Sequence, residues 1–249
     1  MSKYDKFLPI IKELHSKGLR NNEISKEIGV DSRRVSDLLK KLGLKSNKIQ
    51  KLNPTDEQMS ILVGAAMGDG TIFKSKLNKN YRMALAHSMK QKDYFLMKYE
   101  KLKNLIKTDW KLNKEYDKRT KKYYHNIKFQ SRVNPLYNEL YKEWYEDGKK
   151  VIRERNKSLI TPLALAVKYF DDGYDIRGGG GIAMSSFDDE SVRVLSEVIN
   201  SFGIETTTWS DKTIYIKKGS FTKFKELIGK YATKDVLYKL GEFTETPNV

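Results

Sequence analysis

The chain contains no cysteine among its 249 residues. Disulfide bonds and thiolate metal sites are therefore excluded, and the composition fits a reducing compartment. Histidine is also scarce: His15, His87 and His125 lie far apart, without the short spacing that zinc ligands usually show. No apolar run approaches the ~20 residues that a membrane-spanning helix needs, and no signal-peptide pattern opens the chain. We therefore expect an intracellular, non-secreted protein without a zinc centre.

Acidic residues are outnumbered. The chain has 48 Lys and Arg against 32 Asp and Glu, a formal net charge of +16. The excess is uneven, because residues 1–52 carry a net charge of +7, residues 53–158 carry +11 and residues 159–249 carry −2. A balance this basic indicates a polyanionic partner, either nucleic acid or an anionic membrane surface. We expect a cytoplasmic or nucleoid-associated protein, with an organelle as an alternative.

Two segments of similar pattern end in Asp-Gly. Residues 62–70 read LVGAAMGDG and residues 165–173 read LAVKYFDDG. The first segment follows a Thr-x-x-Gln with the spacing of a capping box, and the second follows a Thr-Pro pair that suits the start of a helix. The glycine after each aspartate suits a helix end. Each segment therefore predicts one carboxylate, Asp69 or Asp172, at the C-terminus of a helix.

An aspartate at a helix C-terminus is electrostatically unfavourable, because that end already carries partial negative charge. A cation nearby would compensate, and carboxylate oxygens are ligands that suit Mg²⁺ (or Mn²⁺), which also binds phosphate oxygens. Small residues such as Gly64 and Ala166 would let the two helices approach closely. The pattern indicates metal-dependent chemistry on a polyanion, against the alternative of two ordinary buried helices.

At these residues the sequence resembles the LAGLIDADG homing endonucleases, in the single-chain form that carries two copies of the motif. The resemblance spans residues 54–240 and places Asp69 and Asp172 at the eighth motif position, where the family has its metal-binding, catalytic acid. The sixth position, often Asp in the family, is Met67 in the first copy and Phe170 in the second. Asp171 competes with Asp172 for the catalytic role, but we expect it to be an exposed or hydrogen-bonded neighbour.

The resemblance also implies two catalytic lysines, because family members of this form carry one Lys shortly before the second motif and another near the C-terminus. Lys150 and Lys239 fit these places and would stabilise negative charge on the reacting phosphate. The chain departs from the family in having Arg153 where Pro usually follows Lys-x-Ile. His87 follows a predicted strand and suits a general base, but we expect a structural role because no partner stands near it in the sequence.

The first 43 residues predict a separate domain of three short helices. Residues 24–38 carry apolar side chains at the spacing of a helix-turn-helix, with Gly29 at the turn. Residues 44–54 are polar and basic and predict a linker. A three-helix bundle used only for packing is the alternative, but the tandem arginines favour contacts with DNA phosphates. The residues expected to bind DNA from the recognition helix are Ser32, Arg33, Arg34, Ser36 and Lys40.

The rest of the chain predicts an α+β fold. Residues 55–150 and 151–249 each show the element order αββαββα, which predicts two tandem, pseudo-symmetric LAGLIDADG subdomains behind the small helical domain. The four glycines at 178–181 are expected to form a hairpin turn. Two-stranded ribbons fit the major groove, with alternate side chains facing the base edges. The residues expected to face the groove are Lys74, Lys76, Arg82, Lys111, Lys114, Lys128, Arg177 and Trp209.

These features favour a monomeric, metal-dependent endonuclease that acts on double-stranded DNA at a long site, asymmetric because the two halves differ. The resemblance adds a homing endonuclease of a mobile element that cuts across the minor groove. Two alternatives on the same fold stay open: a maturase that binds intron RNA, and a DNA-binding regulator that does not cut. Loss of the motif acids would favour the regulator, and both acids are present, whereas a maturase can also keep them.

Overall fold

The chain divides into two units after Lys51. The amide of Leu52 donates to Asn134 Oδ1 at 2.9 Å, which ties Leu52 to the second unit. Asn47 Nδ2 donates to the carbonyl of Leu19 at 2.9 Å, which ties Asn47 to the first unit. The division therefore falls inside the segment predicted as a linker.

This computed structural model describes residues 3–47, 49–76 and 78–242. Lys48 of the predicted linker and residues 243–249 of the predicted second subdomain lie outside the described residues. Within the described ranges, no helix combines the length and the apolar character that crossing a membrane requires.

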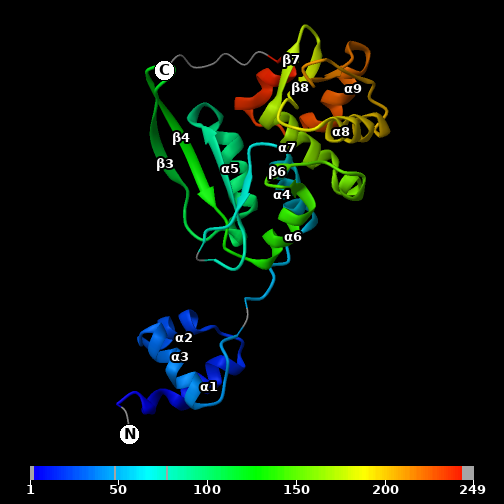
Figure 1. The fold of residues 1–249 in the computed structure, drawn as a ribbon. Coiled ribbons are helices and arrows are strands. Elements are labelled where there is room, and N and C mark those ends of the chain that lie inside the picture. Colours follow the sequence, from blue (N-terminus) through cyan, green and yellow to red (C-terminus); the bar gives the residue numbers. More distant parts are fainter. Residues whose placement is uncertain (1–2, 48, 77, 243–249) are drawn as a thin grey trace. The chain divides into compact units, whose positions relative to one another are not determined.

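The first unit is helical. A 3₁₀ turn at Asp5–Phe7 precedes α1 (Leu8–Ser16), α2 (Asn21–Ile28) and α3 (Ser32–Lys41), which are drawn in blue in Figure 1. Gly29 ends α2 with a φ of 65°, and the Asp31 carboxylate accepts a hydrogen bond from the amide of Arg33 at 2.8 Å at the start of α3. The helices enclose a small core of Ile11, Ile24, Val30, Val35, Leu38 and Leu39. The three predicted helices are present, and a role of this unit in DNA binding stays a prediction.

The second unit contains two successive sets of elements in the same order. The first set is α4 (Asp56–Met67), β1 (Thr71–Phe73), β2 (Arg82–Ser88), α5 (Lys92–Lys101), β3 (Lys111–Asp117), β4 (Lys122–Gln130) and α6 (Pro135–Trp144). The second set is α7 (Pro162–Asp172), β7 (Gly173–Ile176), β8 (Gly179–Ile182), α8 (Asp189–Ser201), β9 (Thr206–Thr208), β10 (Ile214–Ile216) and α9 (Lys218–Gly229). The predicted α+β fold is therefore confirmed.

Short elements connect and close the two sets. A hairpin of β5 (Tyr145–Glu146) and β6 (Lys149–Lys150) and the 3₁₀ helix η4 (Glu154–Leu159) lie between them, and the 3₁₀ helix η5 (Lys234–Leu240) follows α9. Further 3₁₀ turns, η2 (Met89–Gln91) and η3 (Lys103–Leu105), flank α5. One apolar core runs through both sets. The second unit is thus two similar halves that share their interior.

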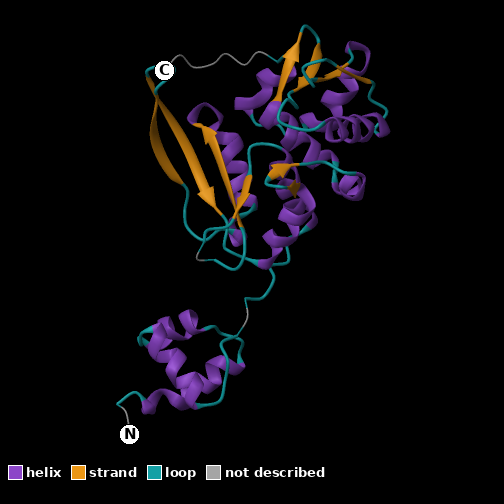
Figure 2. Ribbon diagram, viewed as in Figure 1, coloured by secondary structure: helices purple, strands orange, loops and turns teal. Residues whose placement is uncertain are grey.

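Each half contributes one antiparallel four-stranded sheet. Both sheets are drawn in orange in Figure 2. The strand orders are β1-β2-β4-β3 and β7-β8-β10-β9, so the two sheets have the same topology. Burial alternates along β2: Met83, Leu85 and His87 are buried beneath helices, whereas Ala86 and Ser88 are exposed. One face of the sheet therefore packs on helices, and the other is open.

The helices α4 and α7 pack against each other in the middle of the second unit (Figure 1). Their small residues permit this contact, because a Cβ placed on Gly64 would lie only 2.5 Å from the Cβ of Val167. A Cβ on Gly68 would overlap the carboxylate of Asp171. The close approach that the small residues predicted is present, and it brings the ends of both Asp-Gly segments together.

The glycine run is not the hairpin turn that the sequence predicted. Only Gly178 lies in the turn, with a φ of 88°, while residues 179–181 belong to β8. The missing side chains make room for neighbours: a Cβ on Gly179 would lie 2.7 Å from the Tyr215 ring, and one on Gly180 would lie 2.7 Å from the Phe221 ring. The run is therefore a strand whose side-chain space is filled by bulky residues from elsewhere.

Candidate active site

Both motif helices begin where their capping signals predicted. Thr55 Oγ1 accepts from the amide of Gln58 at 3.2 Å, and the Gln58 side chain accepts from the amide of Thr55, which completes the capping box. Thr161 Oγ1 accepts from the amide of Ala164 at 3.1 Å. These fixed starts, together with the tight helix contact, set where the two C-terminal ends and their carboxylates lie.

Asp69 follows the C-terminal end of α4 and is surrounded by negative charge. Burial and the charges of Asp171 and Asp172 raise the pKa of Asp69 to about 6. Its side chain is still 40% exposed, so part of the carboxylate faces solvent. The structure thus brings both predicted acids into one electrostatic neighbourhood, in which an added cation would relieve repulsion.

Asp172 is the last residue of α7 and has a cationic partner. Lys168 Nζ lies 2.7 Å from Asp172 Oδ2, one helical turn earlier on the same helix. The Lys168 side chain is buried, while the carboxylate is 31% exposed. A hollow of about 340 Å³ opens beside the pair, lined by Met67, Gly68, Lys149, Lys150, Lys168, Asp172, Ala183, Ser186 and Phe187. Asp172 therefore reaches solvent through a space bordered by three lysines.

The two predicted lysines occupy matching places. Lys150 Nζ donates to the carbonyl of Gly68, and Lys239 Nζ donates to the carbonyl of Asp171 at 2.8 Å. Gly68 and Asp171 both stand at the seventh motif position, one residue before the predicted catalytic acid. Burial lowers the pKa of both lysines below the ordinary value. Each half thus holds one ammonium group against the backbone of one motif.

A buried polar cluster beside Asp69 was not predicted from the sequence. Asp171 Oδ1 accepts from Lys98 Nζ and from the Tyr94 hydroxyl, each at 2.9 Å, and Asp171 Oδ2 accepts from the amide of Asp69 at 2.9 Å. Lys98 Nζ also lies 2.5 Å from His87 Nε2. Asp171 is therefore hydrogen-bonded, one of the two roles expected for it, and it is buried rather than exposed.

Charges within this cluster offset each other. Burial works against the negative charge of Asp171, but the Lys98 ammonium outweighs it, so the pKa of Asp171 lies below its ordinary value. Burial and the same ammonium lower the pKa of His87 to about 3, which keeps the imidazole neutral. His87 Nδ1 lies 3.4 Å from Asp69 Oδ2. The cluster therefore places a neutral ring next to a predicted metal ligand.

The sequence did carry a signal for these residues. Lys98 lies four positions from Tyr94 and four from Leu102, in the apolar stripe of a predicted helix. Met83, Leu85 and His87 are alternate residues of one strand, so His87 is expected on the same buried face as Met83 and Leu85. A titratable residue at a core position usually has a buried partner.

The donor set fits a hard divalent cation. Oxygen and nitrogen atoms of Asp69, His87 and Asp171 lie within 4.8 Å of one another, and the carboxylate of Asp172 is close enough to act on Asp69. Asp171 is fully buried and already paired with Lys98, so Asp69 and Asp172, which both reach solvent, remain the better ligands. Carboxylates are the side chains that Mg²⁺ and Mn²⁺ prefer.

The open face of the first sheet carries part of the predicted basic set. Lys111 pairs directly with Lys128, and Lys128 pairs with Ala86, so these three side chains share the face that the helices leave open. Arg82 lies on the same face, four residues before Ala86. The structure does not bring Lys114 together with them: it pairs with His125 on the opposite face and lies over the Tyr123 ring, 4.4 Å from the centroid.

The remaining predicted groove residues lie in connections between strands. Lys74 and Lys76 follow β1 and are exposed, and Arg177 lies between β7 and β8 with a φ of 44°. Trp209 follows β9, is 42% exposed and stacks on Tyr215 with ring centroids 5.2 Å apart.

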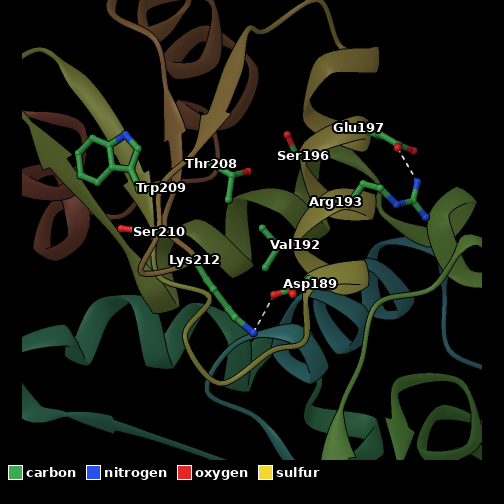
Figure 3. A pocket seen from close by; sticks show the side chains of 9 residues that line it. All are labelled: Asp189, Val192, Arg193, Ser196, Glu197, Thr208, Trp209, Ser210 and Lys212. Carbon is green, nitrogen blue, oxygen red and sulfur yellow. Dashed lines mark hydrogen bonds and ion pairs between the residues drawn. The ribbon is translucent and has the colours of Figure 1, made fainter.

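Trp209 also borders a pocket of about 400 Å³ between α8 and the β9–β10 hairpin (Figure 3). Its lining residues are Asp189, Val192, Arg193, Ser196, Glu197, Thr208, Trp209, Ser210 and Lys212. The ion pair of Lys212 with Asp189, at 2.9 Å, joins the hairpin side to α8, whereas Arg193 and Glu197, 2.5 Å apart, pair along α8 itself (Figure 3). None of the predicted catalytic residues lines this pocket.

In the first unit, the predicted recognition residues all lie on α3. Arg33, Arg34 and Lys40 are exposed, while Ser32 and Ser36 are partly buried. The Ser32 hydroxyl donates to Asn22 Oδ1 at 2.6 Å. The helix therefore presents three cations to solvent, and their contact with DNA stays a prediction.

Comparison with known proteins identifies the fold and the family. Residues 59–224 match the LAGLIDADG DNA endonuclease family. The chain is 26% identical over 208 residues to the cytochrome b mRNA maturase bI2 of Debaryomyces hansenii, covering 80% of this chain and 79% of that protein. It is 23% identical over 210 residues to the DNA endonuclease I-ChuI of Chlamydomonas applanata, covering 76% of this chain and 96% of that protein. Several other relatives are longer, and the chain spans about half of their length.

Among solved structures, the homing endonuclease I-WcaI bound to its DNA recognition sequence has the same fold. The TM-score is 0.68 at 21% sequence identity, covering 76% of this chain and 88% of that chain. The family match covers most of the second unit, including Asp69, Asp172, Lys150 and the buried cluster. The family predicted from the two Asp-Gly segments is therefore confirmed: the chain belongs to the LAGLIDADG DNA endonuclease family.

Proposed function

We propose that the chain is a site-specific endonuclease for double-stranded DNA that works with a divalent cation. One observation carries the proposal: Asp69 follows one of two tightly packed helices and Asp172 ends the other, and a lysine, partly buried Lys150 or buried Lys239, contacts the residue before each acid. The family match supports a nuclease, and the two structurally similar halves suit the two strands of a duplex. The protein would act as a monomer, because both halves belong to one chain.

The chain's own groups would divide the work as follows. A bound Mg²⁺ or Mn²⁺ would supply positive charge for the phosphate oxygens and for the attacking water. Asp69 and Asp172 would hold the cation with their solvent-facing oxygens. Lys150 and Lys239 would stabilise the charge that develops on the phosphate, because fixed cations in a partly buried site need no reorganisation. Their backbone contacts hold each ammonium group in place before DNA arrives.

The open sheet faces would read the target. Lys111, Lys128 and Arg82 lie on one such face, where they can reach phosphates and base edges in a major groove. The face of the second half presents Trp209 and few cations, in line with the negative net charge of residues 159–249. The two halves would therefore contact different sequences, which implies an asymmetric target.

The direct test is cleavage of a randomised duplex library with Mg²⁺, followed by sequencing of the ends. On the target so found, Asp69→Asn and Asp172→Asn should each abolish cutting while DNA affinity stays within about threefold of the wild type. Asp175→Asn, an exposed acid three residues beyond Asp172, is the matched control and should cut normally. Normal cutting by both motif variants would refute the assignment of the acids.

A role of the first unit is a separate part of the proposal. We propose that α3 lengthens the binding site through phosphate contacts of Arg33 and Lys40. Arg33→Gln should weaken target binding and lower its salt dependence, because each phosphate contact contributes a slope of about 0.9 in log K against log salt. Lys12→Gln, an equal charge change on α1, should have a smaller effect. Equal effects of both variants would contradict a recognition role for α3.

RNA binding is a second candidate, favoured by the similarity to the maturase of Debaryomyces hansenii. If no duplex is cut, binding to the RNA of an intron that contains or flanks the gene should be measured by filter retention. A maturase would bind that RNA at least tenfold more tightly than a scrambled RNA of equal length.

A further inference from the structure

The strongest unassigned feature is the chain of buried polar groups that ends at Asp69. It runs from Asp171 on α7 to Lys98 on α5, then to His87 on β2, and reaches the acid that follows α4. We propose that His87 is a positioning residue, which orients the carboxylate of Asp69 through a neutral Nδ1–H. This inference rests on the proposed function only in assigning metal binding to Asp69.

The contact with Lys98 fixes which nitrogen of His87 carries the proton. A lysine ammonium has three donors and no acceptor. Lys98 Nζ lies 2.5 Å from His87 Nε2, so Nε2 must be the acceptor. In a neutral imidazole the proton then resides on Nδ1. The ring therefore presents a donor, not a lone pair, toward Asp69.

Within the described residues, no hydrogen bond of normal geometry engages the Nδ1 atom of His87. It is buried without a hydrogen-bond partner, and Asp69 Oδ2 lies 3.4 Å from it. The amide of Gln91 also acts on the ring, but no hydrogen bond of normal geometry joins it to Nδ1. Leaving a buried donor unsatisfied costs about 1–3 kcal/mol. A small shift and rotation of the half-exposed carboxylate would bring Oδ2 to the distance and angle of an ordinary hydrogen bond with Nδ1.

Asp171 lies at the other end of the chain of groups. Its two carboxylate oxygens accept hydrogen bonds from Lys98 Nζ, the Tyr94 hydroxyl and the amide of Asp69. Asp171 therefore holds both the Lys98 ammonium and the Asp69 backbone in place. Both side chains of the Lys98–Asp171 pair are 0% exposed. The second motif thus orients the acid of the first motif across the helix interface.

The acid of the second motif is supported differently. Asp172 pairs with the ammonium of Lys168 at 2.7 Å, at the fourth motif position, where the first motif has Ala65. An ammonium competes with a bound cation for the carboxylate charge, whereas a neutral N–H orients the carboxylate without cancelling that charge. Loss of His87 should therefore impair the Asp69 side of the site, and loss of Lys168 should affect the Asp172 side.

The test compares His87→Leu, which removes the donor, with His87→Asn, whose amide nitrogen takes about the place of Nδ1. Mn²⁺ is titrated into the full chain, and free Mn²⁺ is followed by electron paramagnetic resonance. Hydrogen-bond partners of metal ligands typically contribute 10- to 100-fold. We expect His87→Leu to weaken Mn²⁺ binding at least tenfold, and His87→Asn to restore most of it at an equal or lower melting temperature.

Cleavage supplies the second readout, on a target duplex labelled separately on each strand. His87→Leu should lower the cleavage rate of one strand at least tenfold at unchanged KM, so that nicked duplex accumulates. Lys168→Met is the matched change beside Asp172, and it should alter mainly the cleavage rate of the opposite strand. Failure of the wild type to cut any DNA would count against the proposed function, whereas the Mn²⁺ titration still decides the role of His87.

Three results would overturn the inference. The first is equal Mn²⁺ affinity of the wild type and His87→Leu. The second is a ¹⁴N coupling in the Mn²⁺ spectrum of the wild type that shows a directly bound imidazole, because Nδ1 would then be a ligand and not a donor. The third is equal slowing of both strands by His87→Leu with no rescue by His87→Asn, the pattern of a purely structural defect.

Discussion

Replacing Lys98 with methionine should destabilise the second unit strongly. The ammonium lies 2.9 Å from Asp171 Oδ1, and both side chains are completely buried. Methionine keeps most of the length of the lysine stem but leaves the carboxylate without its counter-charge. Removing one partner of a buried ion pair costs about 3–5 kcal/mol. For a unit of this size the melting temperature should fall by about 10 °C.

A double variant separates charge from packing. Asp171→Asn alone would leave Lys98 unpaired and should also be costly, but combined with Lys98→Met it leaves no buried charge. The introduced asparagine could still accept the hydrogen bond from the Tyr94 hydroxyl with its amide oxygen. The double variant should therefore lie within about 1–2 kcal/mol of the wild type, so that the two changes couple strongly.

The effect should also depend on pH. In the wild type the pKa of Asp171 is lowered, so its ionised form stabilises the fold above the ordinary value of 3.8, and this stabilisation is lost as the pH falls. Without Lys98, burial raises the pKa of Asp171, and the penalty is largest at neutral pH. The difference in unfolding free energy between the wild type and Lys98→Met should shrink on going from pH 7.5 to pH 4.5.

Urea unfolding followed by tryptophan fluorescence is a suitable assay. The three tryptophans, Trp110, Trp144 and Trp209, all lie in the second unit, so the signal reports that unit alone. A loss below about 1 kcal/mol for Lys98→Met, or a double variant as unstable as the sum of both single changes, would refute the buried ion pair.

Three further predictions follow from the same geometry. Gly64→Ala should destabilise the protein by about 1–3 kcal/mol in urea unfolding, because its Cβ meets the facing helix, whereas Gly219→Ala, with open space around it, should be neutral or stabilising; equal effects would contradict the tight helix contact. Because the pKa of Asp69 is raised to about 6, the contribution of Asp69 to the free energy of unfolding without metal falls as the pH rises from about 4 through 6. Asp69→Asn should therefore raise metal-free stability at pH 7.5 by about 1 kcal/mol after allowance for screening at its exposed surface, with no gain below pH 4, and a gain that grew in acid would contradict this sign. Lys128→Gln should reduce the slope of log Kd against log salt by about 0.9, while Lys114→Gln, on the opposite face, should leave the slope unchanged. A reduced slope for Lys114→Gln with an unchanged slope for Lys128→Gln would contradict DNA binding on the open face.

Local signals made much of the fold predictable. The helix caps at Thr55 and Thr161 and the small residues within the two motif helices are short-range features. These features allowed both motif helices to be predicted from the sequence. The glycine run was misread because glycine gives no periodicity of its own. Its place in a strand depends on Tyr215 and Phe221, which lie far along the chain and fill the vacant side-chain space.

The site was predictable only where a motif repeats. The acids and the two lysines recur in both halves, so the resemblance located them. The cluster of Asp171, Lys98 and His87 occurs once, and its members come from three separate elements. No spacing in the sequence connects residues whose only relation is a contact in the folded interior. Lys98 and His87 could each be noticed as a polar residue at a core position. The sequence did not indicate which partner each of them would contact.

The contact between Gly68 and Asp171 has a consequence for assembly. One motif offers a void and the other a protruding carboxylate at the same position, so each half is complementary to the other and not to itself. Two copies of the first half would leave a hole at this point, and two copies of the second would press acid against acid. If the gene were split between the halves, the fragments should recombine as mixed pairs and resist homodimerisation. That selectivity would make the halves usable as an obligate heterodimer.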